Sequence, residues 1–309
     1  MKELKTKYGV VRIFARTLED EALGQITALS NSVLGEGANL RIMPDAHAGA
    51  GCVIGTTMLV IDKVCPNLVG VDIGCGVDLV KTDIAFEGRL QELDDIIREF
   101  IPYGKRHHNK AKIFRDFARL RCRDKLKKAT KETAIHSLGT LGGGNHFIEA
   151  YGDGYIAVHS GSRNIGYKVA ELYQTLAEKN MLRREMEQLG SVPEKERQAW
   201  IEGVKEKSKM PKALAYLDGD LMRDYLHDMN IMQEFAAANR KAMLETIAKK
   251  MGGRILSQIT STHNYIDMRN KQMIILRKGA ISARNGEELV IPLNMRDGLL
   301  LCVGKGNPD

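Results

Sequence analysis

The chain has 309 residues, 43% hydrophobic and 28% charged, which are ordinary values for a globular protein. No stretch approaches the roughly 20 apolar residues of a membrane helix, and the N-terminus lacks signal-peptide and transit-peptide patterns, which predicts a cytoplasmic protein with no membrane contact. The net charge of +7 favours polyanionic partners without establishing one. Five cysteines without a CxxC pair argue against a disulfide framework.

Short strands broken by turns are expected over residues 1–90. Four runs rich in Val and Ile suit them: 10–14, 52–61, 68–73 and 77–84. A helix and a connecting loop are expected over 89–120, with a basic run at 105–108. Residues 135–165 return to strands and turns.

Apolar residues recur at helical spacing from Lys168 to about Met251, which predicts a helical insertion interrupted by Pro193 and Pro211. Residues 255–303 are again expected to be strands. Their apolar runs are 272–282, 288–293 and 299–304. The sequence therefore favours an α+β fold, a β-rich core with a helical excursion.

Asp72 and Cys75 follow an apolar run in a turn rich in glycine. Glycine lets the backbone turn sharply, so a carboxylate and a thiol three residues apart can meet at one metal ion. A buried cysteine in a tight turn explains the same segment at least as well. The triplet Gly142–Gly144 before Asn145 and His146 is a similar case, since glycine-rich loops can hold phosphate but are also ordinary turns.

His159 ends an apolar run and is followed by Ser160, Gly161, Ser162 and Arg163. Arg163 beside two hydroxyl groups suits a phosphate clamp, while His159 alone could equally be a satisfied core histidine. His263 lies between an expected helix and a strand.

Near the N-terminus, Asp45 and His47 occupy another glycine-rich turn. Asp45 could position a nucleophile or a metal, or simply cap a turn after Pro44.

Four histidines thus lie at strand or turn junctions rich in Gly, Asn and Ser: His47, His146, His159 and His263. Three others are interpreted as solvated or structural, His107, His108 and His227, and His136 is set aside. A mixed Asp, Cys and His set suits Zn, Mn, Fe or Co better than Mg or Ca, and one thiolate can bridge two such ions.

Together these strings resemble the RtcB family of RNA-splicing ligases. The matching segments run in family order from about residue 41 to residue 309: PDAHAGAGCVIG, GVDIGCGVDL, LGTLGGGNHFIE, HSGSRNIG, LAYLDGDLMRDYLHDM, AAANR, STHNYID and LRKGAISA. The resemblance implies a single RtcB-like domain over 1–309, with mixed or antiparallel sheets and a helical insertion at about 168–251. The tail IPLNMRDG is similar to a short branch of the family associated with release factor H, which implies a functional link to that factor.

The resemblance also implies a ligand set for two Mn²⁺ ions that share the cysteine. These ligands are Asp72, Cys75, His146, His159 and His263. Asn145, Phe147 and Glu149 are implied to contact GTP, with Asn145 at the phosphates and Glu149 at the guanine. Asp45 and Arg163 are implied to be catalytic, Asp45 near the reacting centre and Arg163 at the terminal phosphate of the RNA.

The family joins an RNA 3′-phosphate or 2′,3′-cyclic phosphate end to a 5′-hydroxyl end, in RNA repair or tRNA splicing, through a guanylylated histidine. That histidine lies in an SxPHGAGR-like segment shortly after GKGNP, and this sequence stops at residues 304–309. We expect the 309-residue polypeptide, without the family's C-terminal segment, to bind metal but not to ligate. A stable protein–GMP adduct would contradict that expectation.

Two alternatives remain open beside the ligase. One is a two-metal cyclic phosphodiesterase that opens cyclic phosphates without joining ends. The other is a non-catalytic RNA-binding remnant with a structural metal site.

Overall fold

A computed structural model describes residues 1–207, 210–270 and 273–306. The chain divides into two compact units, described separately below. Unit 1 comprises Met1–Val71, Val169–His227 and Ile266–Ala280, and unit 2 comprises Asp72–Lys168, Asp228–Tyr265 and Ile281–Asp309. Helices and strands both contribute substantially, which confirms the α+β prediction. That the chain forms one family domain stays a prediction.

Unit 1 contains most of a six-stranded mixed sheet. Its order is β1 (Lys2–Thr6), β2 (Gly9–Ile13), β3 (Arg41–His47), β4 (Ile54–Val60), β12 (Ile274–Lys278) and β11 (Asn264–Asp267). β2 and β3 are parallel, whereas β1–β2, β3–β4 and β4–β12 are antiparallel. Helix α1 (Asp20–Asn31) and the short pair β5 (Lys63–Val64) and β9 (Leu217–Asp218) also belong to this unit.

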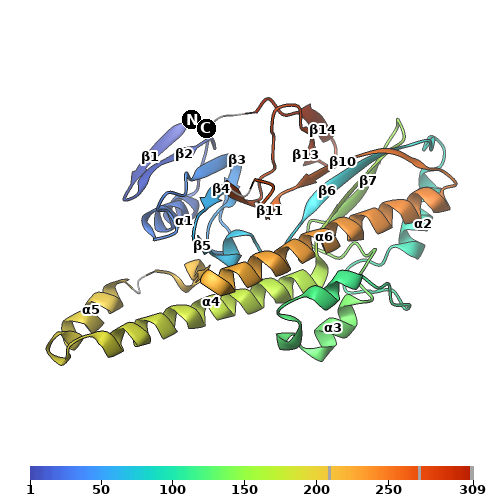
Figure 1. Cartoon of the computed structure of the whole chain (residues 1–309). Helices are drawn as coiled ribbons and strands as arrows, with labels where there is room; N and C mark the ends of the chain where they lie inside the picture. Colours follow the sequence, from blue (N-terminus) through green and yellow to red (C-terminus); the bar gives the residue numbers. More distant parts are fainter. Residues whose placement is uncertain (208–209, 271–272, 307–309) are drawn as a thin grey trace. The chain divides into compact units, whose positions relative to one another are not determined.

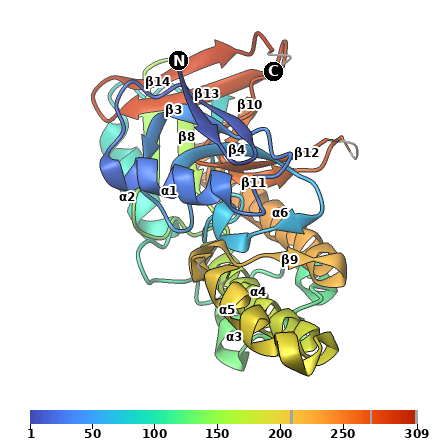
Figure 2. The ribbon, with the colours of Figure 1, turned by 90° about the vertical axis from the view of Figure 1, so that its left-hand side faces the viewer.

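Unit 2 is built on a four-stranded antiparallel sheet with two covered faces. The strand order is β10 (Ile255–Thr262), β6 (Gly76–Thr82), β8 (Tyr155–Ser160) and β7 (Phe147–Tyr151). Apolar side chains of one face pack against α2 (Leu90–Phe100) and the C-terminal part of α6 (Gly219–Lys250). The opposite face packs against the hairpin of β13 (Glu288–Asn294) and β14 (Gly298–Val303), visible together with the sheet in Figure 2.

The helices expected over 168–251 are present. They are α4 (Arg163–Ser191), α5 (Arg197–Lys207) and α6, with short 3-10 turns at Glu194–Glu196 and Lys212–Leu214 (Figure 1). Pro193 and Pro211 fall between them, as predicted, because proline lacks the amide proton that a helix interior needs. Unit 2 also holds the short helix α3 (Lys128–Ala134) and 3-10 turns at Arg115–Arg119 and Arg123–Lys125.

Three local expectations were wrong. Residues 68–73 are not a strand, because the 3-10 turn Pro66–Leu68 leads into turns in which Gly70 and Gly74 adopt positive φ angles of 95° and 73°. Helix α1 lies where only strands and turns were expected. His263 lies between strands β10 and β11, not after a helix. Among the described residues, no helix is both long and apolar enough to cross a membrane.

Candidate metal centre

The register of the unit 2 sheet brings the predicted ligands to one end of its strands. Gly76 pairs with Thr262 on one side and with Ser160 on the other, and His159 pairs with Phe147. The neighbouring residues therefore converge. Across the strand order, these are His263, Cys75, His159 and His146. The backbone N–H of His263 donates to the carbonyl of Cys75 at 2.9 Å, which fixes the first pair.

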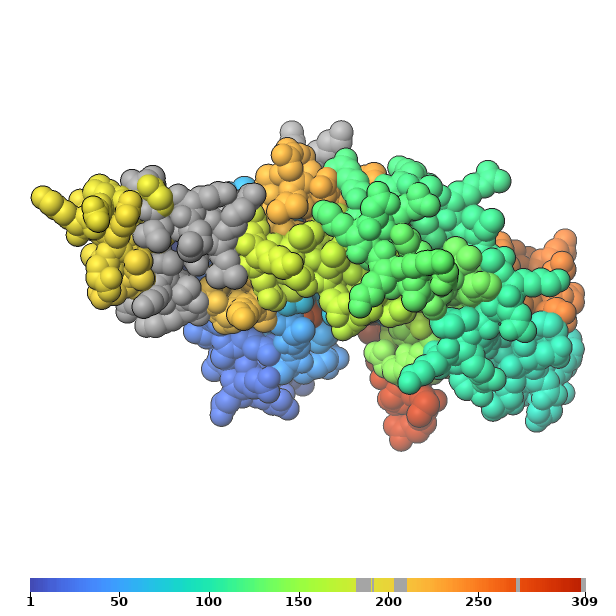
Figure 3. Space-filling view, turned by 90° about the horizontal axis from the view of Figure 1, so that it is seen from below, coloured from blue at the N-terminus to red at the C-terminus, as the bar shows by residue number. Residues whose placement is uncertain are grey.

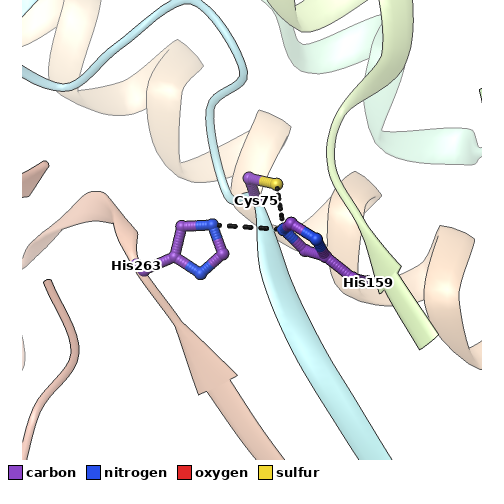
Figure 4. Close-up of side chains that lie close together, drawn as sticks. All are labelled: Cys75, His159 and His263. Atoms are coloured by element: carbon purple, nitrogen blue, oxygen red, sulfur yellow. Dashed lines mark hydrogen bonds between the residues drawn. The ribbon is translucent and has the colours of Figure 1, made fainter. Parts of the chain in front are cut away.

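The ligand atoms lie at the spacing expected around metal ions. Sγ of Cys75 is 3.2 Å from Nε2 of His159, and the Nε2 atoms of His159 and His263 are 3.4 Å apart (Figure 4). Sγ of Cys75 is also 3.5 Å from Nε2 of His146. Bonds of about 2.1 Å to nitrogen and 2.3 Å to sulfur put tetrahedral ligands about 3.4 to 3.7 Å apart.

Cys75 belongs to two overlapping groups of candidate ligands. One is Cys75, His159 and His263, and the other is Asp72, Cys75 and His146; within each group the ligand atoms lie within 4.8 Å of one another. Oδ2 of Asp72 is 3.0 Å from Nε2 of His146. A thiolate common to both groups can bridge two ions. The structure thus brings together all five predicted ligands.

Glycine at position 161 makes room for the carboxylate of Asp72. A Cβ at Gly161 would lie 2.2 to 2.4 Å from the carboxylate atoms of Asp72. The next residue, Ser162, donates its backbone N–H to Oδ1 of Asp72 at 3.0 Å. Gly74 is constrained similarly, because a Cβ there would meet the backbone of Gln233 in α6 at 2.8 Å.

Backbone carbonyls orient two of the histidine rings. Nδ1 of His159 donates to the carbonyl of Asn145 at 3.1 Å, and Nδ1 of His146 lies 3.0 Å from the carbonyl of Leu141. A ring that donates from Nδ1 keeps the lone pair of Nε2 for a metal. Both Nε2 atoms point toward Cys75, so the rings are already in the orientation that ligation needs.

His146 has a choice of tautomer that involves Arg163. Nη1 of Arg163 lies 3.2 Å from Nδ1 of His146, and this guanidinium can only donate. Nδ1 cannot accept from Arg163 and donate to Leu141 at once. Accepting from Arg163 leaves the proton on Nε2, where it is donated to Asp72, whereas ligation through Nε2 requires the bond to Leu141 instead.

Arg163 is held in an unusual conformation at the start of α4. Its φ angle is +57°, a region that non-glycine residues rarely occupy and that recurs at functional sites. A Cβ at Gly142 would overlap its guanidinium, so glycine there leaves the space that Arg163 fills. Nε of Arg163 and Oγ of Ser162 are buried without a hydrogen-bond partner among the described residues. Two such donors next to the ligands suit an anion.

A buried ion pair lies next to the segments that carry the candidate ligands. Nε of Arg240, on α6, lies 2.9 Å from Oδ1 of Asp78, and both side chains are 1% exposed. Nη1 of Arg240 donates to the carbonyls of Gly74 at 2.8 Å and Ser160 at 3.0 Å, next to Cys75 and His159.

Asn239 ties two further segments of the site together. Its Oδ1 accepts from the backbone of Gly139 and Thr140 at 2.7 and 3.0 Å, and its Nδ2 donates to Oγ of Ser160 at 3.2 Å. Asn239 and Arg240 were not singled out from the sequence. The available signal was the polar pair Asn239 and Arg240 directly after the apolar residues FAAA of a helical run.

Burial and neighbouring charges shift the pKa values of four candidate ligands, His159, His263, Cys75 and Asp72. Burial lowers the pKa of His159 to about 4 and that of His263 to about 3, with nearby histidines adding to the effect. Burial and the charge of Asp72 raise the pKa of the Cys75 thiol well above its usual value. Burial works against ionisation of Asp72, but its hydrogen bond to His146 and the charges of His146 and Arg163 lower the pKa overall.

These residues fit a divalent metal. Neutral imidazoles and an ionised carboxylate are ready ligands, and a cation would favour the thiolate of Cys75. The mixed set of sulfur, nitrogen and oxygen atoms suits a transition-metal ion better than Mg or Ca.

The predicted GTP contacts lie beside the centre in unit 2. Asn145 is exposed and contributes its carbonyl to His159. The ring of Phe147 packs on that of His159 with centroids 5.2 Å apart. Glu149 accepts a 2.5 Å hydrogen bond from the hydroxyl of Tyr151. Nothing in the structure tests a nucleotide role for these residues, which stays a prediction.

Asp45 is exposed on β3 of unit 1, where its carbonyl accepts from Nδ1 of His47 at 3.0 Å. Its catalytic role also stays a prediction. Two other histidines of unit 2 bond to backbone carbonyls, His108 to that of Gly139 and His136 to that of His108. The bond of His108 fits its structural interpretation.

Comparison with known proteins gives a consistent result. The family model described as tRNA-splicing ligase RtcB matches residues 30–309. The chain is 29% identical to the RNA-splicing ligase RtcB of Escherichia coli K12, over 88% of this chain and 71% of that protein. It is 26% identical to the tRNA-splicing ligase RtcB of Aeropyrum pernix and 24% to that of Nanoarchaeum equitans, in both cases over 85% of this chain and 69% of the relative.

Proposed function

Because the chain belongs to the RtcB family of RNA-splicing ligases, we propose that it joins an RNA 3′-phosphate or 2′,3′-cyclic phosphate end to a 5′-hydroxyl end, using GTP and two Mn²⁺ ions. The observation that carries the proposal is the place of Cys75 in two overlapping ligand groups. Paired metals are a common solution for phosphoryl transfer, whose transition state spreads negative charge over several oxygens.

The proposed division of labour assigns Asp72 and His146 to one ion, His159 and His263 to the other, and Cys75 to both. Bound ions would neutralise phosphate charge and activate an attacking oxygen. The residues themselves supply orientation: the carbonyls of Leu141 and Asn145 hold the His146 and His159 rings.

Arg163 is the proposed contact for the terminal phosphate of the RNA. Its guanidinium is buried and lacks a partner at Nε, as does the hydroxyl of Ser162. Once Nε2 of His146 is a ligand, Nδ1 donates to Leu141 and Arg163 loses that acceptor. The guanidinium then has donors to spare for an anion in a site sheltered from water, where such bonds are strong.

Asn145, Phe147 and Glu149 are the proposed contacts for GTP. Glu149 currently accepts from the hydroxyl of Tyr151. A carboxylate can accept several bonds, so it could receive guanine N–H groups while keeping Tyr151. Asp45 is proposed to act near the reacting centre, and a link to release factor H is proposed from the sequence resemblance.

Metal stoichiometry tests the bridging assignment directly. We expect the full-length protein to bind two Mn²⁺ ions by calorimetry, Asp72→Asn and His263→Ala to bind one each, and Cys75→Ala to bind neither tightly. Glu92→Gln, an exposed carboxylate on α2, is the matched control and should bind two. Retention of two ions by Cys75→Ala would refute the shared thiolate.

An RNA with a 2′,3′-cyclic phosphate and a 5′-hydroxyl tests the reaction. We expect a joined product that requires both Mn²⁺ and GTP when the SxPHGAGR-like segment of the family is present, and no joined product from residues 1–309 alone. Opening to a 3′-phosphate without joining would favour the second candidate, a two-metal cyclic phosphodiesterase, which would need only the metal ligands and the phosphate contact. An unchanged substrate would contradict both activities.

A further inference from the structure

The basic character of this protein is concentrated in one segment beside the metal centre. Residues 105–131 contain twelve lysines and arginines against two aspartates, a net charge of +10, whereas the whole chain carries +7. The remainder is therefore slightly acidic. We name residues 105–131 the basic segment. Its side chains, teal to green in Figure 3, occupy part of the face seen there.

The basic segment is fastened to the loop that carries His146. The N–H groups of His108 and Lys112 donate to the carbonyls of His136 and Ile135 at 3.1 and 2.7 Å. Just before the segment, the N–H of Gly104 donates to Gly142 at 2.7 Å. Gly142 is the residue that makes room for Arg163. The segment and the ligand loop are thus parts of one hydrogen-bonded structure within unit 2.

An apolar pocket of about 230 Å³ opens in this segment. Its walls include Ile113, Phe114 and Phe117, and Ile165 closes it from the first turn of α4, two residues after Arg163. Ile113 is 76% exposed, an unusual position for a large apolar side chain without a partner.

The aromatic wall of the pocket packs against the buried core of unit 2. Phe114 and Phe117 have ring centroids 5.3 and 4.9 Å from that of Phe235, which is fully buried in α6. Asp228, also buried in α6, accepts the backbone N–H groups of Arg121 and Cys122 at 2.8 and 2.9 Å. The pocket is therefore formed before any ligand arrives.

Cations surround this pocket without acidic partners. Arg115, Arg123 and Lys131 line it, and none forms an ion pair in the part of the chain that the structure describes. Single-stranded nucleic acid combines phosphates with flat bases, and proteins bind it by pairing cations with aromatic surfaces. A pocket with an aromatic wall and a cationic rim matches both features.

We propose that the basic segment is a second RNA-binding site, in which Arg115, Arg123 and Lys131 hold phosphates and the pocket at Phe114 and Phe117 receives one unstacked base. This inference rests on the proposed function for the identity of the nucleic acid. It adds a site for the body of the RNA, away from the end being joined, and so a means of selecting single-stranded regions.

Anisotropy with a fluorescein-labelled single-stranded RNA of about twelve nucleotides, in EDTA, tests the electrostatic part. Each lost phosphate contact reduces the slope of log K against log salt by about 0.7 for single strands. We expect Arg115→Gln with Arg123→Gln to reduce that slope by about 1.4 and to weaken binding about tenfold or more at low salt. The control is Lys249→Gln with Lys305→Gln, two exposed lysines elsewhere in unit 2. Equal slopes in the two variants would overturn the proposal.

A second variant tests the base pocket. Ala118 lines the pocket and is exposed, so Ala118→Trp should fill it without disturbing the core. We expect this variant to weaken RNA binding about fivefold or more, the lower range for one stacked base. The same RNA with abasic sites should bind both proteins alike. Normal binding of intact RNA by Ala118→Trp would contradict the base pocket. Competition by polyglutamate as strong as that by RNA would show that the surface binds an acidic protein instead, and either result would overturn the proposal.

The two proposals can fail separately. RNA binding in EDTA does not depend on metal, GTP or the joining reaction. A protein that binds RNA through the basic segment but joins no ends would keep this inference and lose the proposed ligase activity. A protein that joins short RNA ends, but whose double arginine variant and double lysine control give equal salt slopes, would keep the ligase activity and lose this inference.

Discussion

Replacing Gly161 by alanine should remove one metal ion while leaving the other. The new Cβ would lie 2.2 to 2.4 Å from the carboxylate of Asp72, about an ångström inside normal contact, so that carboxylate must move. Gly161 does not have a positive φ, so alanine fits its backbone conformation. Asp72 belongs to only one of the two ligand groups, and Cys75, His159 and His263 are not displaced.

The loss can be bounded from the contacts involved. Moving Asp72 breaks its 3.0 Å hydrogen bond from the N–H of Ser162 and its contact with His146. Disturbing one group that orients a metal site costs about 10- to 100-fold in affinity, or about 1.4 to 2.7 kcal/mol. We therefore expect one Mn²⁺ site to weaken by that factor or more, and the other to change by less than about threefold, within the scatter of such measurements.

Calorimetric titration with Mn²⁺ resolves the two sites if their affinities separate in this way. The matched control is Gly152→Ala, because Gly152 lies in the β7–β8 turn with open space around it and no positive φ. The control should bind like the parent protein. Two sites of unchanged affinity in Gly161→Ala would refute the role of Asp72, and loss of both would refute its restriction to one ion.

Three further predictions concern the same centre. In EDTA the free energy of unfolding should fall as the pH drops from about 6.5 toward 4, by at most about 1.4 kcal/mol per pH unit for each of His159 and His263. The reason is that both imidazoles take up a proton in the unfolded chain at these pH values, whereas in the folded protein their pKa values are about 4 and 3. Urea unfolding at pH 7 and pH 5 measures the difference. The affinity for Mn²⁺ should rise up to about tenfold per pH unit near neutrality, because the pKa of the Cys75 thiol is raised and its proton must leave when it ligates the metal. Calorimetry at several pH values measures this dependence of affinity on pH, which Cys75→Ser should make weaker. Arg240→Met should cost about 3 to 5 kcal/mol in urea unfolding by leaving Asp78 buried without its partner, and adding Asp78→Asn should recover part of the loss.

Local sequence patterns predicted the strand that carries His159 and the breaks at Pro193 and Pro211. In both cases the signal is local, an apolar run of strand length or a residue that cannot continue a helix. The run at 68–73 looked equally strand-like and is not one. The 3-10 turn Pro66–Leu68 enters this run, and turns with Gly70 and Gly74 at positive φ follow it.

The five ligands themselves could be identified only through the family resemblance. Residue chemistry left a buried cysteine in a tight turn as an alternative at Cys75, an ordinary turn at His146 and a core histidine at His159, and it said little about His263. Asn239 and Arg240 were missed because a helical pattern shows that a residue faces inward but not which polar groups await it. Their partners, the carbonyls of Gly74 and Ser160 and the N–H groups of 139–140, come from distant segments.

Strand register decides whether the metal centre exists at all. Side chains alternate between the faces of a strand, so a slip of one residue in β8 would turn the His159 ring to the opposite face of the sheet. The strand order β10, β6, β8, β7 does not follow the chain, and no short hairpin fixes the pairing of β6 with β8. Arg240 donates to the carbonyls of Gly74, before β6, and Ser160, at the end of β8. These two hydrogen bonds favour the observed register of β6 and β8 at the site. The cost of burying the charge of Arg240 is offset by the carboxylate of Asp78, which lies in β6. We therefore expect the ion pair to act on metal affinity through the alignment of Cys75 and His159, although neither of its members is a proposed ligand.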